Sequence, residues 1–595
     1  MKKILCFVLM VALIILCVPT TEASIFDNTF DINTFEIVSN KYSSILRAWK
    51  EEGIRDDINY VGIVQPSSFA FENEVGSLIN DDHDYDTFLN DEALPSEYLG
   101  QVFQFNQTVN APQSIQMVVD VPEEGLYKIG FDYYSQTTSI NDIKLAIKVN
   151  GQTPFYEASQ LTLKTLWETS HEFSRDRFGN DIMPNASQIY RWVHADLQDA
   201  SRLYEQGLLF KFNAGQNTIE LTRNEGFFLL GQVYVSTYER YIDYETYLTQ
   251  HTTDVVEEEL YTIQAEKPAF KNEVSIRFGT DRNPRNIPFS IIESRLNVVD
   301  GATFDNSGQS IFYEVEVNQT GYYYITIKAK QGKANSGVYR TLTLDGKVPF
   351  KEAERIFFPS MDWENVTLKD KDGNPYKFYL EQGKHTLGLT VNSSPMQPIY
   401  EQIETVMLAV NNLALDIKKL TGNQVDENRD WEITDYMPNI KADMTAFGDA
   451  IKEAYDEWIK VNKTKVESEV SAGLKAAYGW LYELAEKPNE IPAKINRLTG
   501  TTSSVMQRLG IVLPLTIASP LTMDAIYVHG SKAELPQPRP GFFEGIWVEI
   551  QRFFTAIFSN QFGVKNSDEE LNIWVNRSRQ YVNLMQQIVD DEFTT

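Results

Sequence analysis

Residues 150–158 read Asn-Gly-Gln-Thr-Pro-Phe-Tyr-Glu-Ala, and residues 345–353 read Asp-Gly-Lys-Val-Pro-Phe-Lys-Glu-Ala. Two more pairs of segments recur in the same order and at nearly the same spacing. Ala-Phe-Glu-Asn-Glu-Val at 70–75 matches Ala-Phe-Lys-Asn-Glu-Val at 269–274, and Gly-Leu-Tyr at 125–127 matches Gly-Tyr-Tyr at 321–323. Three collinear matches predict two copies of one domain.

Both copies have the pattern of β structure. Residues 127–133 and 323–329 alternate as half-buried strands do. Further strands at 143–149 and 339–344 lead into Asn-Gly and Asp-Gly pairs, which favour tight turns because both residue types tolerate positive φ. Many short strands joined by turns predict a β-sandwich for each copy.

A long insertion in the second copy, at about 399–515, is predicted to be helical. Apolar residues recur every three or four positions in three stripes, which span residues 399–420, 444–459 and 466–481. We interpret the insertion as a helical bundle packed on the sandwich; a surface that docks a partner is the alternative.

The N-terminus predicts export. Lys2 and Lys3 precede an apolar run at 4–18 and a small-residue cleavage site at 21–23, so residues 1–23 are interpreted as a signal peptide. Both cysteines, Cys6 and Cys17, fall inside it, so the mature chain would contain neither a disulfide nor a membrane span. A large secreted protein without disulfides is typical of bacteria. Lipidation at Cys17 stays open, and plain secretion is preferred.

Composition and motifs argue against several classes of function. The 595 residues carry a formal net charge of −30, which disfavours binding to nucleic acids. The six histidines show no metal-binding spacing, and there is no nucleophile elbow or phosphate-binding loop. A non-catalytic protein is therefore expected.

The second copy resembles carbohydrate-binding modules of families 6 and 35. The resemblance rests on Tyr-Thr-Ile-Gln-Ala-Glu at 261–266, Gly-Tyr-Tyr-Tyr-Ile at 321–325, Arg-Thr-Leu-Thr-Leu-Asp-Gly at 340–346 and Leu-Thr-Met-Asp-Ala-Ile at 521–526. It implies a jelly-roll sandwich and a structural Ca²⁺ bound by Glu266 and Asp524, with Gln264 as a third ligand. Two unrelated surface acids are the alternative. In the first copy Ser67 and Gly231 align with the two acids, so no calcium is expected there.

Tyrosines offer candidate sugar contacts. Tyr133 and Tyr324 lie in the predicted strands and could stack on a sugar ring. Alternation in the strands places at least half of such tyrosines in the core, so the assignment of either residue is a hypothesis.

The last thirty residues suggest a further domain. A strand at 572–576, a turn and an apolar helical stripe read as the opening of an α/β domain. The segment resembles the start of the family 1 extracellular solute-binding proteins, the sugar-binding subunits of ABC importers. The resemblance implies permease subunits as partners, an α/β domain of which only the first βα unit is present, and Asn576 and Arg577 as candidate ligand-binding residues.

The sequence thus predicts a mainly β protein with α structure: two jelly-roll-like sandwiches, the second with a helical insertion, then the first βα unit of an α/β domain. It is expected to be a secreted, cell-surface-associated bacterial protein that binds oligo- or polysaccharide, with Ca²⁺ as its one cofactor. The alternatives are the binding-module region of a polysaccharide-degrading enzyme and a structural surface protein. The expected segments are a signal peptide (1–23), a helical segment (24–55), sandwich modules (56–250 and 255–532), a proline-rich linker with an amphipathic helix (533–565) and the start of the α/β domain (566–595).

Overall fold

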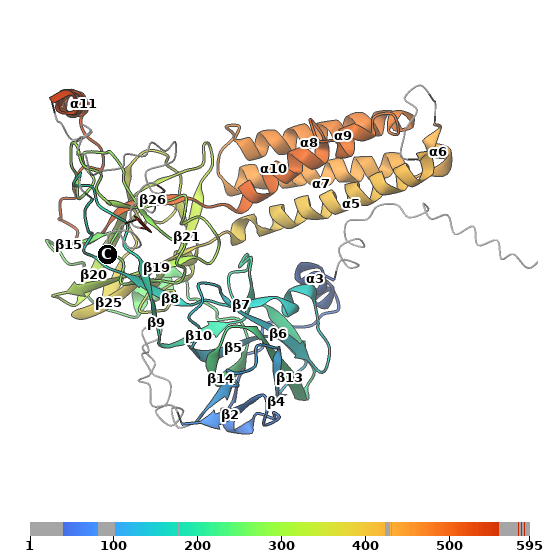
Figure 1. The fold of residues 1–595 in the computed structure, drawn as a ribbon, viewed down its shortest axis with the longest axis horizontal. Coiled ribbons are helices and arrows are strands. Elements are labelled where there is room, and N and C mark those ends of the chain that lie inside the picture. Colours follow the sequence, from blue (N-terminus) through green and yellow to red (C-terminus); the bar gives the residue numbers. More distant parts are fainter. Residues whose placement is uncertain are drawn as a thin grey trace, which may run out of the picture. The chain divides into compact units, whose positions relative to one another are not determined.

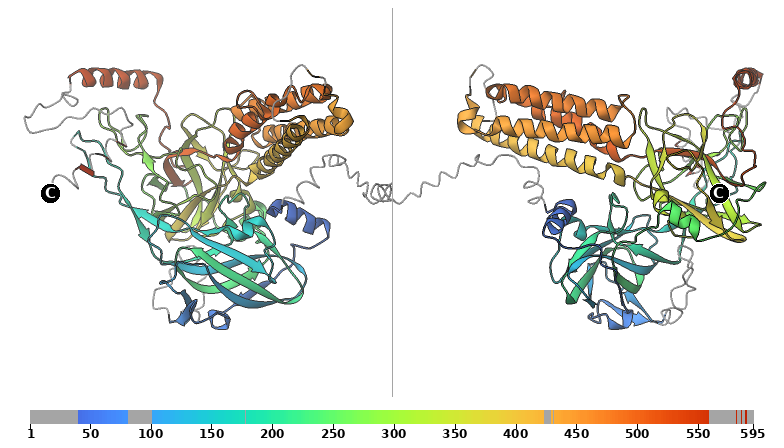
Figure 2. Two further views of the ribbon diagram at one scale, coloured as in Figure 1. Left: turned by 45° about the vertical axis from the view of Figure 1, so that its right-hand side comes forward. Right: turned by 180° about the vertical axis from the view of Figure 1, so that it is seen from behind.

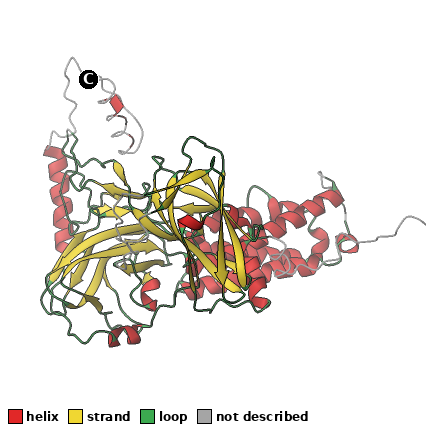
Figure 3. Cartoon of the chain, turned by 90° about the horizontal axis from the view of Figure 1, so that it is seen from below, coloured by secondary structure: helices red, strands yellow, loops and turns green. Residues whose placement is uncertain are grey.

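The computed structural model describes residues 40–80, 101–176, 178–422, 429, 431–558, 581, 585, 588 and 589. The chain forms two compact units. One contains residues 395–517 and the N-terminal helix α3 (Tyr42–Glu51), and the other contains residues 53–394 and the chain from 518 onward. Strands dominate the second unit and helices the first (Figure 3). The expected signal peptide, Cys17 and the residues Asn576 and Arg577 lie outside the described part of the chain.

The first module, hereafter module 1, is a sandwich of two antiparallel sheets. Its first sheet has the order β10-β5-β14-β3-β2, with β1 beside β14 and β12 beside β5. These strands are β1 (Val61–Val64), β2 (Gly76–Ile79), β3 (Val102–Phe105), β5 (Gly125–Ser135), β10 (Trp192–Asp196), β12 (Leu209–Phe212) and β14 (Phe228–Ser236). The second sheet has the order β11-β7-β6-β13-β4, with β4 (Gln113–Val121), β6 (Ile143–Val149), β7 (Leu161–Leu163), β11 (Gln198–Asp199) and β13 (Gly215–Glu225).

Module 2 repeats this architecture after the short helix α4 (Tyr244–Thr249). One sheet has the order β17-β18-β26-β20-β23, with β15 beside β26 and β24 beside β20. These strands are β15 (Leu260–Gln264), β17 (Phe278–Gly279), β18 (Val298–Val299), β20 (Gly321–Gln331), β23 (Glu364–Thr367), β24 (Phe378–Leu380) and β26 (Leu521–His529). The other sheet contains β16 (Phe270–Lys271), β19 (Ser310–Val317), β21 (Val338–Leu344), β22 (Ile356–Phe358) and β25 (Gly383–Val391).

The predicted repeat is visible residue by residue. Strands β5 and β20 both begin at a glycine, both have 11 residues, and both show the same burial pattern along their length. The turns after β6 and β21 also agree, because Asn150 and Gly151 have φ of 52° and 77° and Asp345 and Gly346 have φ of 49° and 80°. The prediction of β-sandwich modules with a helical region is confirmed.

The two modules share one sheet across the expected boundary between residues 250 and 255. Strands β8 (Leu166–Thr169) and β9 (Ala186–Ile189) come from module 1, yet they continue the second sheet of module 2 in the order β22-β21-β25-β19-β16-β8-β9. In Figure 1, β8 and β9 lie at the edge of the sheet that contains β19, and β16 lies between β19 and β8. Leu166 packs there with Phe270 and Phe312, whose rings stack at 4.4 Å. We call the segment 165–191 the hairpin arm.

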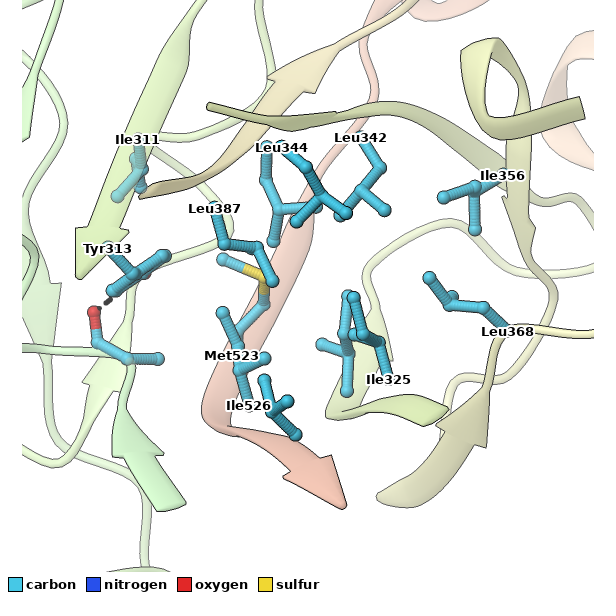
Figure 4. Close-up of a cluster of buried hydrophobic side chains, with 14 of the residues drawn as sticks. Ile311, Tyr313, Ile325, Leu342, Leu344, Ile356, Leu368, Leu387, Met523 and Ile526 are labelled. Atoms are coloured by element: carbon cyan, nitrogen blue, oxygen red, sulfur yellow. Dashed lines mark hydrogen bonds between the residues drawn. The ribbon is translucent and has the colours of Figure 1, made fainter. Parts of the chain in front are cut away.

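The core of module 2 lies between its two sheets (Figure 4). Ile325 from β20, Leu342 from β21 and Met523 from β26 are all 0% exposed and belong to one cluster of buried side chains. The Tyr313 hydroxyl, inside this core, donates to the Ala265 carbonyl at 2.9 Å. Burying one apolar side chain of this size contributes about 1.5–3 kcal/mol to the free energy of folding. The buried side chains of the predicted strands therefore stabilise the packing of the two sheets.

The helical insertion runs from Gln397 to Ile517 between β25 and β26. It comprises α5 (Gln397–Thr421), α6 (Ile433–Tyr436), α7 (Ile440–Val461), α8 (Glu469–Glu486), α9 (Ile495–Thr499) and α10 (Val505–Ile517). The long helices α5, α7, α8 and α10 lie side by side in both views of Figure 2 and contact one another. Ser468 caps α8 by accepting from the Ser471 N–H, and Gly422 follows α5 with a φ of 78°.

The last described helix, α11 (Phe542–Phe558), turns its apolar face outward. On this face Trp547 is 59% exposed and Phe553 63%. The opposite side contacts module 2, because Arg285 pairs with Glu544 at 2.6 Å and Arg552 donates to the Arg282 carbonyl at 2.7 Å. No described helix combines the length and apolarity that crossing a membrane requires.

Candidate functional site

The predicted metal ligands are brought together by the pairing of β15 with β26. Gln264 lies opposite Ala525, and the Ala265 N–H donates to the Asp524 carbonyl at 2.9 Å. Glu266 follows directly after β15 and is 0% exposed, and Asp524 is 1% exposed. These are therefore not two unrelated surface acids.

Among the described residues, the buried Glu266 carboxylate has no hydrogen-bond partner at either Oε1 or Oε2. Burial raises the pKa of Glu266 to about 8, and the nearby Asp524 adds to the increase. A buried carboxylate without donors is unusual, because burying such a group costs free energy unless a proton or a cation neutralises it.

Asp524 is already neutralised by a residue that the sequence analysis missed. Lys328 Nζ lies 2.7 Å from Asp524 Oδ2, and the Ile287 N–H donates to Asp524 Oδ1 at 3.1 Å. Burial lowers the pKa of Lys328 and raises that of Asp524, and the attraction between the two charges opposes both changes. Lys328 also donates to the Arg285 carbonyl at 2.6 Å, so its ammonium is held from two sides.

A second pair continues the charge cluster along β20. Lys330 Nζ donates to Asp281 Oδ2 at 2.6 Å, and the Trp363 indole donates to Asp281 Oδ1 at 3.1 Å. Lys330 lies 5.0 Å from the centre of the Trp363 ring, within range of a cation–π contact. Lys328 and Lys330 on this face of the sheet therefore each pair with a carboxylate, that of Asp524 and that of Asp281.

The geometry fits a calcium ion only in part. The two free oxygens of Glu266 are ligands that Ca²⁺ prefers. The Asp524 carboxylate does not fit, since Lys328 already supplies the cation. Among the described residues, no three His, Cys, Asp or Glu side chains are grouped as metal ligands. An ion at this place would be held by Glu266, by Gln264 and by backbone carbonyls.

Module 1 has a buried acid at the position where module 2 has the buried Lys328. The eighth residue of β5 is Asp132, as Lys328 is the eighth of β20, and both are 0% exposed. Asp132 Oδ1 lies 2.9 Å from Nδ1 of His194, and the Tyr234 hydroxyl donates to Asp132 Oδ2 at 3.0 Å. The buried charge is thus an anion held by a histidine in module 1 and a cation held by an aspartate in module 2.

His194 is held between two acids. Burial lowers its pKa, but the hydrogen bond with Asp132 and the negative charge of Asp196, whose Oδ1 lies 3.8 Å from His194 Nε2, outweigh burial and raise it to about 9. Burial opposes the change at Asp196, yet His194 and Lys128 lower its pKa to about 2. His194 is therefore protonated at neutral pH. The signal that could have located Asp132 and Lys328 was a charged residue in a mostly apolar strand, although β5 also contains Lys128 and β20 also contains Lys330.

The structure separates the candidate sugar-binding tyrosines. Tyr133 is 3% exposed and its hydroxyl donates to the Lys164 carbonyl at 2.6 Å, so its ring lies inside module 1 and is closed to a ligand. Alternation along β5 points this residue inward, which is the physical reason. Tyr324 points to the other side of its sheet, is partly exposed and lies 5.8 Å from the His529 ring.

The helical insertion is similar to a domain of known proteins. Residues 398–515 match the family model described as the four-helix bundle domain of bacterial solute-binding proteins. The match covers the bundle and not the sandwiches. No curated protein matches the chain.

Solved structures resemble the sandwich modules only distantly. A family 35 carbohydrate-binding module from Clostridium thermocellum shares 16% identity with a TM-score of 0.16, over 30% of this chain and 99% of that one. A Podospora anserina GH26-CBM35 β-(1,4)-mannanase shares 11% identity with a TM-score of 0.16, over 34% of this chain and 31% of the enzyme. A Paenibacillus xanthan lyase shares 12% identity with a TM-score of 0.16, over 56% of this chain and 25% of that one. This chain spans under a third of either enzyme, and scores this low carry no functional argument.

Proposed function

We propose that the protein is a non-catalytic, extracellular binding protein for oligo- or polysaccharide that acts with the permease subunits of a bacterial ABC sugar importer. The observation that carries the proposal is the match of residues 398–515 to the four-helix bundle of bacterial solute-binding proteins. The carbohydrate part rests on the sequence motifs of module 2. Their residues form its first strand, its strand β20 and its last strand β26.

The charged clusters support a structural role rather than catalysis. Lys328 and His194 each pair with a buried acid, and neither pair leaves an acid or a base available to contact a substrate. General acid–base catalysis needs groups within hydrogen-bond reach of the substrate. The clusters instead fix the outer faces of two equivalent sheets.

Capture of the permease tests the importer role. The tagged mature chain, cross-linked on intact bacterial cells, is expected to retain permease subunits identified by mass spectrometry. A matched variant replaces residues 395–517 with a short glycine–serine linker between Ser394 and Ala518, which removes the bundle and keeps the sandwich unit. If the bundle provides the transporter contact, this variant loses the permease while its sandwich unit still unfolds cooperatively. Equal capture by both chains, or capture of no permease, contradicts the proposal.

Incubation with polysaccharides tests the non-catalytic part. We expect the purified chain to bind oligosaccharide without releasing reducing ends. A hydrolytic activity that persists through repurification would instead favour the polysaccharide-degrading alternative.

A further inference from the structure

Among the described helices, α11 has the most exposed large apolar side chains. Eight of them are between 40% and 83% exposed: Phe542, Phe543, Ile546, Trp547, Ile550, Phe553, Phe554 and Ile557. At about 100° per residue these eight occupy one continuous arc of about 140°, and Glu544, Val548 and Arg552 lie on the other side. A contiguous exposed apolar surface of this kind marks an interaction site. We call these eight residues the apolar arc.

The opposite side of α11 is fastened to module 2. Glu544 pairs with Arg285 at 2.6 Å, and Val548 is 9% exposed. The Arg552 guanidinium donates to the Arg282 carbonyl at 2.7 Å. Figures 2 and 3 show the helix at the periphery of its unit. Because these contacts hold the polar side, the apolar arc is kept facing outward.

The proline-rich linker that precedes α11 is also bound to module 2. The Asn365 amide donates to the Pro536 carbonyl, and the Asn283 amide donates to the Pro538 carbonyl, each at 2.8 Å. Proline fixes φ, so a linker with three prolines in five residues is stiff. A helix that is held at its start and along one side presents a rigid surface.

The charges around the apolar arc suit a partner that carries phosphate groups. The two acids of the helix, Glu544 and Glu549, each pair with an arginine at 2.6 Å. Arg282 and Arg539 border the helix and are exposed, and Arg539 shares its charge with Asp362 at 3.1 Å. Guanidinium groups bind phosphate oxygens well. The local surface is therefore not acidic, although the whole chain has a formal net charge of −30.

We propose that α11 is an in-plane membrane anchor, which lies among the headgroups of a phospholipid bilayer with its apolar arc toward the acyl chains. Five of the eight side chains in the arc are aromatic, and aromatic rings favour the boundary between headgroups and acyl chains. A bilayer accepts a convex apolar face of this width without a matching groove. The arginines beside the helix then lie at the level of the lipid phosphates. This inference goes beyond the proposed function, which concerns the permease and the sugar.

Co-flotation of the purified mature chain with phosphatidylcholine vesicles tests the proposal. We expect the chain to float with the vesicles, with only a small fall at high salt, because apolar burial supplies most of the free energy. Replacing both Phe553→Ser and Phe554→Ser should weaken partitioning about tenfold or more. The matched control replaces Leu408→Ser and Leu415→Ser, which are 43% and 47% exposed on α5, and should leave partitioning unchanged.

Trp547 reports whether the helix itself enters the bilayer. Phosphatidylcholine that is brominated on its acyl chains quenches the fluorescence of tryptophans that enter the bilayer, so wild-type fluorescence should fall when these vesicles are added. Trp547→Phe keeps an aromatic ring in the apolar arc. This variant should float as well as the wild-type chain and should lose most of the quenching.

Three results would overturn the proposal: no flotation of the wild-type chain, equal loss of flotation in the two double variants, or undiminished quenching in Trp547→Phe. Two results without lipid would also overturn it. A concentration-dependent dimer that the Phe553 and Phe554 changes abolish would assign the arc to a second copy of the chain. A lower thermal unfolding midpoint in that double variant would assign the arc to contacts within the chain.

The outcome is separable from the importer proposal, because the vesicles contain no permease. A chain that captures permease on cells but does not float with vesicles lacks the membrane anchor only. A chain that floats through the apolar arc but captures no permease lacks the importer role only.

Discussion

Lys328 and Asp524 form an ion pair of 2.7 Å that is sealed from solvent, with 0% and 1% of the two side chains exposed. The pair joins the adjacent strands β20 and β26, which are separated in sequence by the whole helical bundle. Because the pair lies at the centre of a sheet, variants of its two residues test how module 2 tolerates buried charge.

Removing one partner of this pair should be more harmful than removing both. Asp524→Leu or Lys328→Met alone leaves an uncompensated buried charge, and we expect each to lower the free energy of unfolding by about 3–5 kcal/mol. The double variant should recover most of that loss. Urea unfolding at pH 7 measures the cycle. Lys532→Gln serves as control, because the Lys532–Glu257 pair is about 60% exposed on both sides and should cost under about 1 kcal/mol. Additive single effects would contradict the coupling.

Glu266 should make the protein less stable as the pH rises. Its pKa is raised to about 8 in the folded protein against 4.5 for the free side chain, so the unfolded state binds fewer protons between these values. The free energy of unfolding therefore falls from about pH 4.5 to about pH 8, by roughly 2–4 kcal/mol without metal. Glu266→Gln removes this slope. Chemical unfolding at several pH values in chelator checks it, and an unchanged slope in the variant would count against the assignment.

Calcium should reverse this penalty if Glu266 is a ligand. We predict that Ca²⁺ raises the thermal unfolding midpoint at pH 7 relative to chelator, and that binding releases a proton from Glu266. Glu266→Gln should abolish both effects. Asp281→Asn is the matched control, because it removes an acid bound to Lys330 and Trp363 and should lower stability without changing the calcium response. Indifference of the wild-type chain to calcium would end this prediction.

His194 should stabilise module 1 most at low pH. Its folded pKa of about 9 lies above the ordinary 6.5, so its contribution is complete below pH 6.5 and is lost as the pH rises through 9. We expect His194→Gln to lower stability by on the order of 1–3 kcal/mol at pH 6 and by little at pH 10. The variant and wild-type unfolding curves at the two pH values measure this difference, and a deficit of equal size at both would contradict it.

The hairpin arm should make the two modules unfold together. Leu166 is 5% exposed and packs on Phe270 and Phe312 of module 2. Leu166→Ala should therefore cost about 2–4 kcal/mol and still give one cooperative transition for both modules in calorimetry. Leu415→Ala, at a position 47% exposed on α5, should change stability by under about 0.5 kcal/mol. Two resolved transitions for the modules would show that the arm does not couple them.

The repeat and the elements of the sandwich were predictable because they are local patterns. Alternation in β5 and β20 and the Asn150 and Asp345 turns are properties of a few neighbouring residues. The hairpin arm was not predictable, because nothing in residues 165–191 states that its partner is β16, about a hundred residues later. The apolar stripe of α11 likewise predicted the helix, but not that Arg552 and Glu544 would be the residues facing module 2.

The candidate site was predictable only through motif resemblance. Glu266, Gln264 and Asp524 do meet, as the paired first and last strands require. Lys328 escaped notice because its role depends on a strand that lies almost two hundred residues later in the sequence. Asp132 and His194 escaped for the same reason, since cross-strand partners follow from sheet register and not from spacing along the chain.

The position of the bundle between β25 and β26 also delays the completion of one sheet of module 2 during synthesis. Strand β26 pairs with β15, β18 and β20, so this sheet of module 2 stays open until the ribosome has passed His529. Until then β20 presents an unpaired edge, which invites association with other chains. The nascent protein would depend on chaperones or on an extended export state over that interval, and a stall within the bundle would release a chain with an unfinished sheet. A chain that ends within residues 395–517 would therefore lack the strand β26 that joins β15, β18 and β20 in this sheet.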